Sequence, residues 1–405
     1  MAHVHARGRS LLAALLTLPL LLAGCGGGDS GGTTSGGGAG GSASGGGNAI
    51  PVGIVTTTSG LLGGYGNQYV TGLRAGVDYA TQGSNAVKGR PIDLRIVDDG
   101  GDPAKAVSAA TDLVGQGVKV LAGTASSGVA VQLAPFAKEN DALYISGPAA
   151  TDAVTGINKN TFRSGRQTYQ DVATAASLLE NVSGKVLVFA QESEFGKGNV
   201  AAVKAVLGSK GATVEELLAP LNANEFTPFA QQIKDRKPDL LFVAWAGETT
   251  SGMWQALQQQ GVFDATRVTT GLGDSASFSA YGKDPQDIRF LAHYFAQAPD
   301  NDVNRALVQR APKADLFSPD GFVAGQMIVR ALSEGDPKDT SSMVRALEGW
   351  SFDAPKGRQT IRAEDHAMLQ PMFTAQLSGE PASRTAKRLS VLPPEAVAPP
   401  AKKIP

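Results

Sequence analysis

The segment VKVLAGTASSGVAVQLAPFAKENDALYI, residues 118–145, contains the structural unit that recurs through most of this chain. It begins with the β-branched run Val118–Leu121, continues as a helical pattern over Gly128–Glu139, and ends in a second apolar run, Ala142–Ile145. Short apolar runs that alternate with helical stretches of about 10–15 residues are typical of βαβ units. The segment therefore predicts two parallel strands joined by a helix.

The same alternation extends to both sides of this segment. The further expected strands are Pro51–Val55, Ile92–Val97, Lys185–Phe189, Val214–Leu217 and Asp239–Ala244, and the further expected helices cover 69–81, 103–115, 196–209, 226–236 and 250–260. The stretch 155–168 interrupts this rhythm, and a second series starts after it. Since there are too many units for one doubly wound sheet, we expect an α/β protein with two Rossmann-like lobes, each built on a parallel-type central sheet.

The amino terminus has the order of a secretory signal. Arg7 and Arg9 precede an apolar run of 12 residues, Leu11–Leu22, which is too short for a membrane-spanning helix of about 20 residues. The ending Leu22-Ala23-Gly24-Cys25 resembles the lipobox of bacterial lipoproteins and contains the only cysteine of the chain. The resemblance implies that 1–24 is a lipoprotein signal peptide, that Cys25 is lipidated, and that the protein is extracytoplasmic and membrane-anchored. An ordinary secretory signal with an incidental cysteine is the alternative.

Two terminal segments have compositions that predict little packed structure. Thirteen glycines fall within 26–48, so we interpret 25–48 as a Gly/Ser-rich tether with a random-coil reach of about 25–29 Å. The carboxyl-terminal segment 381–405 contains two Pro-Pro pairs and no apolar periodicity, which predicts a Pro-rich, disordered tail.

The composition favours binding over catalysis. With a net charge of −1 the chain has no basic surplus for nucleic acid. Only His293 and His366 remain after the leader, without a thiol beside them, so neither a metal cage nor a cofactor is expected. Phe195-Gly196-Lys197-Gly198 lacks the Ser or Thr of a phosphate loop, and Gly273–Ser277 lacks the last glycine of a nucleophile elbow.

An ordered set of short motifs is similar to the branched-chain amino acid (leucine/isoleucine/valine) substrate-binding proteins of ABC importers, in their lipoprotein form. The similarity covers about 50–380 and is carried by Gly64-Tyr65-Gly66, Asp102-Pro103, Gly123–Ser127, Ser146–Thr151, Phe162-Arg163, Phe195–Gly198, Lys237–Leu240, Gly271–Asp274 and Asp365-His366. The resemblance implies the type I periplasmic binding protein fold, a monomer, and two partners, an ABC permease and its ATPase.

The same resemblance implies how the chain is divided. It places 49–164 and 297–350 in lobe 1, and 165–296 and 351–380 in lobe 2. Three chain crossings then join the lobes, near Phe162–Thr168, His293–Pro299 and Trp350–Pro355. A ligand would lie in the cleft between the lobes and be trapped by hinge closure.

A carboxylate site is expected where Ser126-Ser127-Gly128 opens a helix. The first backbone N–H groups of a helix and the positive end of its dipole attract an anion. The resemblance implies that Ser127, with Ala149 and Thr151 of the Ala-Ala-Thr turn, binds the α-carboxylate of the ligand. The alternative is that Ser127 and Thr151 serve only as helix caps.

The resemblance also implies an ammonium site and a side-chain pocket. Asp274, in a glycine-rich loop after a strand, would pair with the ligand ammonium group, although an aspartate in a surface turn is the alternative. The pocket walls would include Tyr65, Phe195, Trp245 and Glu248. Aromatic residues beside strands are, alternatively, often part of the core.

Together these features predict a solute-binding lipoprotein that captures an amino acid, branched-chain or related, or a similar small polar ligand and delivers it to a permease. A sensor that binds an amide, a urea or an aromatic acid is the second hypothesis. A surface-anchored hydrolase is the third, and the shortage of histidine and the incomplete elbow count against it.

Overall fold

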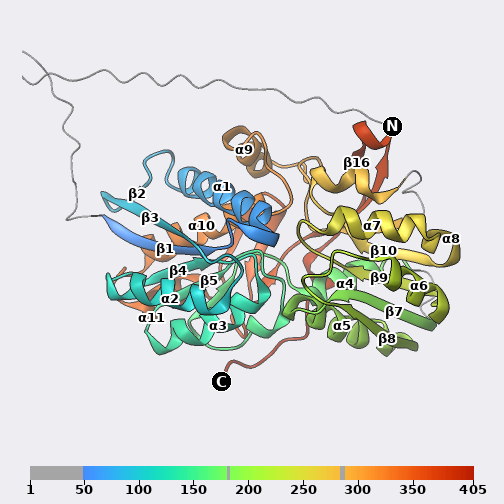
Figure 1. The fold of residues 1–405 in the computed structure, drawn as a ribbon. Helices are drawn as coiled ribbons and strands as arrows, with labels where there is room; N and C mark the ends of the chain where they lie inside the picture. Colours follow the sequence, from blue (N-terminus) through green and yellow to red (C-terminus); the bar gives the residue numbers. More distant parts are fainter. Residues whose placement is uncertain (1–48, 180–182, 283–287) are drawn as a thin grey trace, which may run out of the picture. The chain divides into compact units, whose positions relative to one another are not determined.

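The computed structural model describes residues 49–179, 183–282 and 288–405, and two large sheets dominate them (Figure 1). The first sheet has the order β2-β3-β1-β4-β5-β6, in which β2 is antiparallel to β3 and all other neighbours are parallel. Its strands are β1 (Ile50–Thr56), β2 (Ala86–Val87), β3 (Arg90–Asp98), β4 (Val120–Gly123), β5 (Leu143–Ser146) and β6 (Thr161–Arg163).

Helices cover both faces of the first sheet because its strands are apolar on both sides. Val52 and Ile54 on β1 belong to a core with α1, α10 and α11, whereas the neighbouring Val55 belongs to a core with α2 and α3. The helices of this half are α1 (Gly63–Ala80), α2 (Pro103–Gly115), α3 (Ser127–Glu139), α9 (Asp302–Arg310), α10 (Ser318–Glu334) and α11 (Thr340–Leu347). The expected doubly wound arrangement is confirmed.

The second sheet repeats this design and carries two antiparallel strands at one edge. Its order is β16-β15-β11-β10-β9-β7-β8, and its strands are β7 (Gly184–Gln191), β8 (Ala212–Ala219), β9 (Leu240–Ala244), β10 (Arg267–Gly271), β11 (Ile288–Ala292), β15 (Met372–Ser378) and β16 (Thr385–Leu392). Its helices are α4 (Thr168–Ala176), α5 (Glu194–Val206), α6 (Thr227–Arg236), α7 (Thr250–Gln259) and α8 (Val262–Ala265). Leu187 and Phe189 face one core and Val186 and Val188 the other.

Between the two sheets the chain passes three times. The first passage, 164–167, joins β6 to α4, and the second, 293–301, joins β11 to α9. The third lies at Gln370-Pro371, just before β15. The predicted assignment of all of 351–380 to the second lobe is wrong, because Phe352 and Ile361 are part of the first core. They belong to a small antiparallel sheet of β12 (Ser351–Ala354), β13 (Gly357–Ile361) and β14 (Met368–Leu369).

The prediction of a disordered tail over 381–405 is also wrong. Within this segment β16 pairs antiparallel with β15 along its whole length, from Thr385 opposite Ser378 to Leu392 opposite Met372. Leu392 and Val397 then pack on Met372. Most β16 side chains are exposed, so the strand is stabilised chiefly by backbone hydrogen bonds to β15. Such an edge strand shows little apolar alternation in its sequence.

Helix α1 begins at Gly63, six residues before the predicted start, so Tyr65 lies in the first helical turn instead of a loop. Gly66 in this turn is required for a steric reason. A Cβ atom on Gly66 would lie 1.7 Å from the backbone oxygen of Thr57. The helix can therefore start directly against the end of β1 only with glycine at that position.

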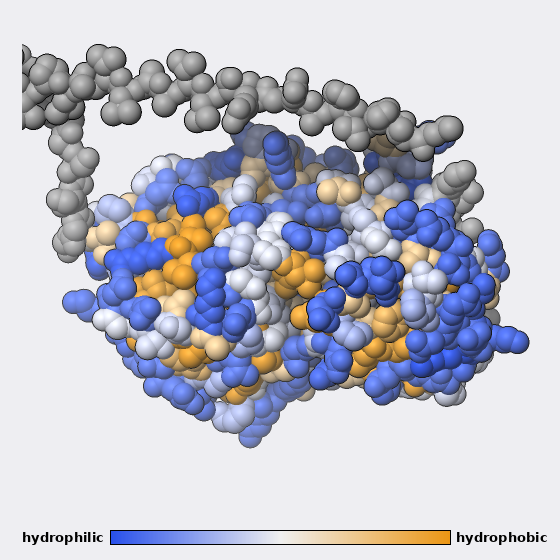
Figure 2. Space-filling model, viewed as in Figure 1, coloured by the Kyte–Doolittle hydropathy of each residue, from blue (hydrophilic) through white to orange (hydrophobic). Residues whose placement is uncertain are grey.

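The predicted signal peptide 1–24, the lipidation site Cys25 and the tether 25–48 lie outside the described residues. No helix within the described ranges is both long and apolar enough to cross a membrane. The face seen in Figure 2 is a mixture of hydrophilic and smaller hydrophobic areas. Large hydrophobic side chains that are about half exposed include Leu221, Leu389 and Val391.

Candidate functional site

A cavity of about 390 Å³ lies at the carboxyl ends of the parallel strands of both sheets. The first sheet contributes Thr57 after β1, Ser126 and Ser127 after β4, and Pro148 and Ala150 after β5. The second contributes Gln191 at the end of β7, Trp245 after β9, Gly273 after β10, and His293 after β11. This edge is where open α/β sheets bind ligands, and the volume is within the range of about 300–1,000 Å³ for small-molecule pockets.

The amino terminus of α3 opens onto this cavity. Ser126 is its N-cap residue, and the Ser126 hydroxyl accepts a hydrogen bond from the backbone N–H of Val129. Ser127 and Gly128, the first residues of the helix, line the cavity together with Ser126. The helix therefore directs the positive end of its dipole towards the cavity, as the sequence predicted.

Of the three residues predicted to bind a carboxylate, only Ser127 lines the cavity. Its hydroxyl accepts a hydrogen bond from the backbone N–H of Thr151, at 3.3 Å. The Thr151 hydroxyl donates to Oε1 of Glu194, at 3.1 Å, and also accepts from Ala153 N–H as a cap. Ala149 and Thr151 do not line the cavity, whereas Ala150, the residue between them, does.

The segment from Ala149 to Thr151 is held from behind by Arg163. This buried guanidinium donates to the backbone oxygens of Ala149, at 2.8 Å, and Thr151, at 3.2 Å. It also donates to the Thr155 hydroxyl, at 2.8 Å. Arg163 therefore positions the turn next to Ser127 and does not itself line the cavity.

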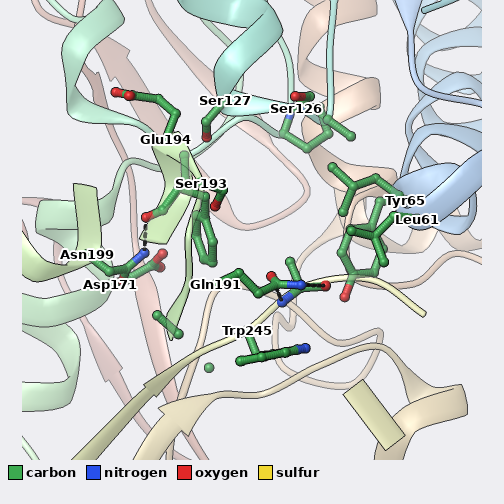
Figure 3. A pocket seen from close by; sticks show the side chains of 18 of the residues that line it. Leu61, Tyr65, Ser126, Ser127, Asp171, Gln191, Ser193, Glu194, Asn199 and Trp245 are labelled. Carbon is green, nitrogen blue, oxygen red and sulfur yellow. Dashed lines mark hydrogen bonds between the residues drawn. The ribbon is translucent and has the colours of Figure 1, made fainter. Parts of the chain in front are cut away.

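Aromatic side chains form part of the cavity walls, and the three aromatic residues selected from the sequence, Tyr65, Phe195 and Trp245, are among the lining residues. Tyr65 and Trp245 are labelled in Figure 3. The ring of Tyr65 packs on Phe317, with 4.6 Å between the centroids. Trp245 is held by an edge contact with Phe226 and by a hydrogen bond from its indole N–H to the Thr249 hydroxyl. Burial raises the pKa of Tyr65 to about 12, so its hydroxyl stays protonated at neutral pH.

The two predicted acidic residues, Asp274 and Glu248, are not among the residues that line the cavity. Asp274 follows the lining residue Gly273, and its carboxylate accepts a long hydrogen bond of 3.4 Å from the side-chain amide of Gln68. Burial and the nearby Asp315 raise the pKa of Asp274. The Glu248 side chain is exposed, while its backbone N–H binds the backbone oxygen of Leu61. The ammonium role of Asp274 stays a prediction.

Charged and polar residues that sequence reasoning did not select form another part of the lining. Arg166 lies in the first passage between the sheets, Asp171 on α4, and Gln191 and Glu194 at the end of β7 and the start of α5. The strand-end rule could have found Gln191 and Glu194, because both follow a predicted strand. No pattern in the sequence singles out Arg166 or Asp171.

Several hydrogen bonds join the two halves around the cavity. The Tyr65 hydroxyl accepts from the backbone N–H of Gly247, at 3.2 Å. Asp315 accepts from both the backbone N–H and the hydroxyl of Ser275, at 2.9 and 2.6 Å. With the Thr151–Glu194 bond, these contacts hold the sheet edges together over the cavity. Tyr65 and Glu194 line the cavity themselves, so two of these bonds form at its wall.

Histidine 293 should make the stability of the protein depend on pH. The residue is 4% exposed, and burial together with the positive charges of Arg166 and Lys356 lowers its pKa well below 6.5. The unfolded chain therefore binds a proton below about pH 6.5 that the folded chain does not. We expect the free energy of unfolding to fall by up to about 1.4 kcal/mol for each pH unit below that point.

The variant His293→Asn isolates this contribution, because asparagine cannot titrate in this range. Asp320 acts in the opposite direction, since burial raises its pKa and a raised carboxyl pKa favours the folded state at lower pH. The comparison must therefore be the difference between the variant and the original protein, measured by urea unfolding at about pH 7.5 and about pH 5. An identical pH dependence in both proteins would contradict the expected role of His293.

Two α/β halves that enclose a cavity between their strand ends define a bilobal solute-binding fold. The family model described as a periplasmic binding protein matches residues 49–383, and the chain belongs to this family. Among the described residues, no cluster of His, Cys, Asp and Glu could hold a metal ion.

The chain is also similar to two Leu/Ile/Val-binding proteins. The Leu/Ile/Val-binding protein BraC3 of Rhizobium johnstonii is 26% identical over 74% of this chain and 83% of its own length. The Leu/Ile/Val-binding protein homolog 3 of Brucella melitensis is 25% identical over 80% of this chain and 90% of its own length.

Solved structures show the same fold. An ABC-type branched-chain amino acid transporter protein of Rhodopseudomonas palustris is 29% identical, with a TM-score of 0.73 over 87% of this chain and 99% of its own. A solute-binding protein of R. palustris in complex with 4-hydroxybenzoate is 21% identical, with a TM-score of 0.78 over 88% and 98%. The second likeness concerns the fold alone. The prediction of a type I periplasmic binding protein is confirmed.

Proposed function

We propose that this protein is the solute-binding component of an ABC importer and that it binds an amino acid, branched-chain or related, in the cavity between its two sheets. The observation that carries the proposal is the cavity itself, lined by strand ends from both sheets, aromatic walls and the amino terminus of α3. An aromatic or aliphatic side chain fits the walls, and a carboxylate fits the helix terminus. The Leu/Ile/Val-binding relatives support the same ligand class.

An aromatic carboxylic acid is the second candidate ligand, and a specific observation favours it. The acid predicted to bind an ammonium group, Asp274, does not line the cavity, whereas Tyr65, Phe195, Trp245 and Phe317 do. A ligand with a ring and a carboxylate but no ammonium group would use the observed walls fully. Proteins of the same fold have been solved with 4-hydroxybenzoate and with benzoate.

Release and capture would need the two halves to separate, and the three passages between the sheets support a hinge. We propose that 164–167, 293–301 and Gln370-Pro371 bend while the two sheets move as rigid lobes. The cross-cavity bonds at Tyr65 and Ser275 would then break on opening. Delivery to a permease, and anchoring through a lipid on Cys25, belong to the same proposal.

A ligand screen tests the proposal directly. L-amino acids, benzoate, 4-hydroxybenzoate and generic amides are added to the protein without residues 1–48, and thermal unfolding is followed. A ligand that binds only the folded state, at about 100 times its dissociation constant, should add roughly 2.7 kcal/mol to the free energy of unfolding. If no amino acid and no aromatic acid stabilises the protein, the proposed function is wrong.

Trp245 should carry much of the affinity for whichever ligand binds. Replacing Trp245 by alanine removes a large apolar wall of the cavity, and we expect the dissociation constant to rise by about 30-fold or more, in the range of hot-spot residues. Isothermal titration calorimetry measures this change.

Trp350→Ala is the matched control, since Trp350 stacks on Phe352 and does not line the cavity. It should leave the dissociation constant unchanged. Equal loss of affinity in both variants, or none in Trp245→Ala, would contradict the placement of the ligand against this wall.

A further inference from the structure

Arg166 is a buried cation on the wall of the cavity, and only part of its guanidinium is used by the protein. Its Nη1 donates to the backbone oxygen of Pro148, at 2.7 Å, and its Nε lies 3.2 Å from Oδ2 of Asp171. The guanidinium also packs over Phe317, with 5.5 Å from its central carbon to the ring centroid. These three contacts come from both halves of the molecule and fix the position of the side chain.

The Nη2 group of Arg166 donates to no residue in the part of the chain that the structure describes. The side chain is 7% exposed, so bulk water solvates little of it, yet the residue lines the cavity. A guanidinium offers five N–H donors in a planar fork, and leaving some of them unused at a buried position is costly. A carboxylate is the group that matches this fork in charge and shape.

Arg166 belongs to a cluster of charged side chains that are mostly buried. The buried groups that interact electrostatically with Arg166 are the cations Arg163 and Lys356 and the acids Asp171 and Asp320. Asp152 also interacts with Arg163 and Asp171, so the cluster contains three basic and three acidic side chains. His293, on the same wall, is neutral because burial lowers its pKa well below 6.5. It is the Nη2 edge of Arg166, and not a net charge of this cluster, that favours a carboxylate.

The side chains of the carboxylate site predicted from the sequence already make hydrogen bonds within the protein. The Ser127 hydroxyl already accepts a hydrogen bond from Thr151 N–H, and the Thr151 hydroxyl already donates to Glu194. Of the groups in that predicted set, Ser127 alone lines the cavity, where its hydroxyl offers a single O–H donor beside the α3 terminus. Arg166 therefore offers a stronger anion contact than the predicted set does.

We propose that Arg166 binds the carboxylate of the ligand through its Nη2 edge, with Asp171 as the internal partner that holds the guanidinium in place when the cavity is empty. This inference rests on the proposed function, because it names the residue that selects carboxylic acids at that site. Asp171 contacts Arg166 through Oδ2 alone, so the fork is not fully engaged by the protein. Amino acids and aromatic acids both contain a carboxylate, so both offer the group that Arg166 would bind.

The experiment compares acids with their neutral amides in Arg166→Gln. The probes are L-leucine with L-leucinamide and benzoate with benzamide, titrated by calorimetry. Loss of one partner of a buried charge pair should weaken binding of the preferred acid by about 30-fold or more, while binding of the matching amide hardly changes. The preference for acid over amide should therefore disappear, which a merely structural role of Arg166 would not produce. Whether wild-type protein binds L-leucine or benzoate more tightly shows whether the carboxylate belongs to an amino acid or to an aromatic acid.

Arg384→Gln is the matched control, because Arg384 is 7% exposed, donates to the backbone oxygens of Phe278 and Gly282, and does not line the cavity. It should keep the wild-type preference. If Arg166→Gln does not fold, Arg166→Lys replaces it, with an expected loss of about tenfold because an ammonium group lacks the planar fork. An unchanged acid preference in the Arg166 variant overturns the inference and leaves the proposed function intact. Wild-type protein that binds neither acid contradicts the proposed function and the inference together.

Discussion

Replacing Gly72 by alanine should lower the free energy of unfolding by about 3 kcal/mol, because the added methyl group has no room. Gly72 lies on α1 where this helix packs against the start of α10. A Cβ atom at position 72 would lie 1.9 Å from the backbone oxygen of Ser318, and backbone atoms cannot move aside as a side-chain end can. The two helices would have to separate, which opens the core that they share. Urea unfolding followed by circular dichroism measures the effect.

Gly64→Ala is a matched control in the same helix. A Cβ atom at position 64 would meet no heavy atom within 4 Å, so only helix propensity changes there. Alanine is favoured over glycine in a helix by up to about 1 kcal/mol, and the control should be neutral or slightly stabilising. If Gly72→Ala were as stable as Gly64→Ala, the close approach of α1 and α10 would be wrong.

Asp99→Ala should be destabilising by about 3–5 kcal/mol, because it leaves several buried donors without an acceptor. The Asp99 carboxylate is fully buried and accepts from the hydroxyls of Thr57 and Thr124, both at 2.6 Å, and from the backbone N–H of Gly101, at 2.7 Å. These bonds tie together the ends of β1, β3 and β4. Since Thr57 and Gly101 also line the cavity, ligand affinity should fall as well.

Asp112→Ala is the comparison for this prediction. Asp112 is exposed on α2, and surface substitutions of this kind usually change stability by no more than about 0.5 kcal/mol. Chemical unfolding of both variants, with calorimetric titration of the ligand found in the screen, gives the two readouts. A loss of stability below about 1 kcal/mol in Asp99→Ala would show that the network contributes little.

Much of the fold could be predicted from the alternation of short apolar runs and helical stretches. Val118–Leu121 and Gly128–Glu139 correspond to β4 and α3 within two residues at each boundary. The failures lie where the structure depends on distant contacts. β16 exists because β15 offers it an edge, and β12 to β14 join the first core because Phe352 and Ile361 find apolar partners there.

The candidate site was predicted in part, and the distinction has a physical basis. Ser127, Phe195 and Trp245 line the cavity because each follows closely on a strand, and parallel strands end at one edge of a sheet. Tyr65 reaches the same edge from the first turn of α1, the helix that follows β1. Asp274 obeys the same rule, yet the loop turns its carboxylate towards Gln68. The direction of a side chain within a loop depends on what packs against it, which a strand-end rule does not contain.

The sequence by itself shows where apolar residues repeat with the period of a strand or of a helix. This pattern determined the α/β class, the two series of βαβ units, and the sheet edge at which a ligand is expected. These are local properties, because hydrophobic periodicity reports which side of each element is buried. Only the tertiary structure decided which distant groups meet at the cavity. Arg166 with Phe317, Tyr65 with Gly247, and Thr151 with Glu194 come together because the two sheets share one boundary. Charge and hydrogen bonding act through space, so the identity of the groups that face a ligand is a property of the folded chain.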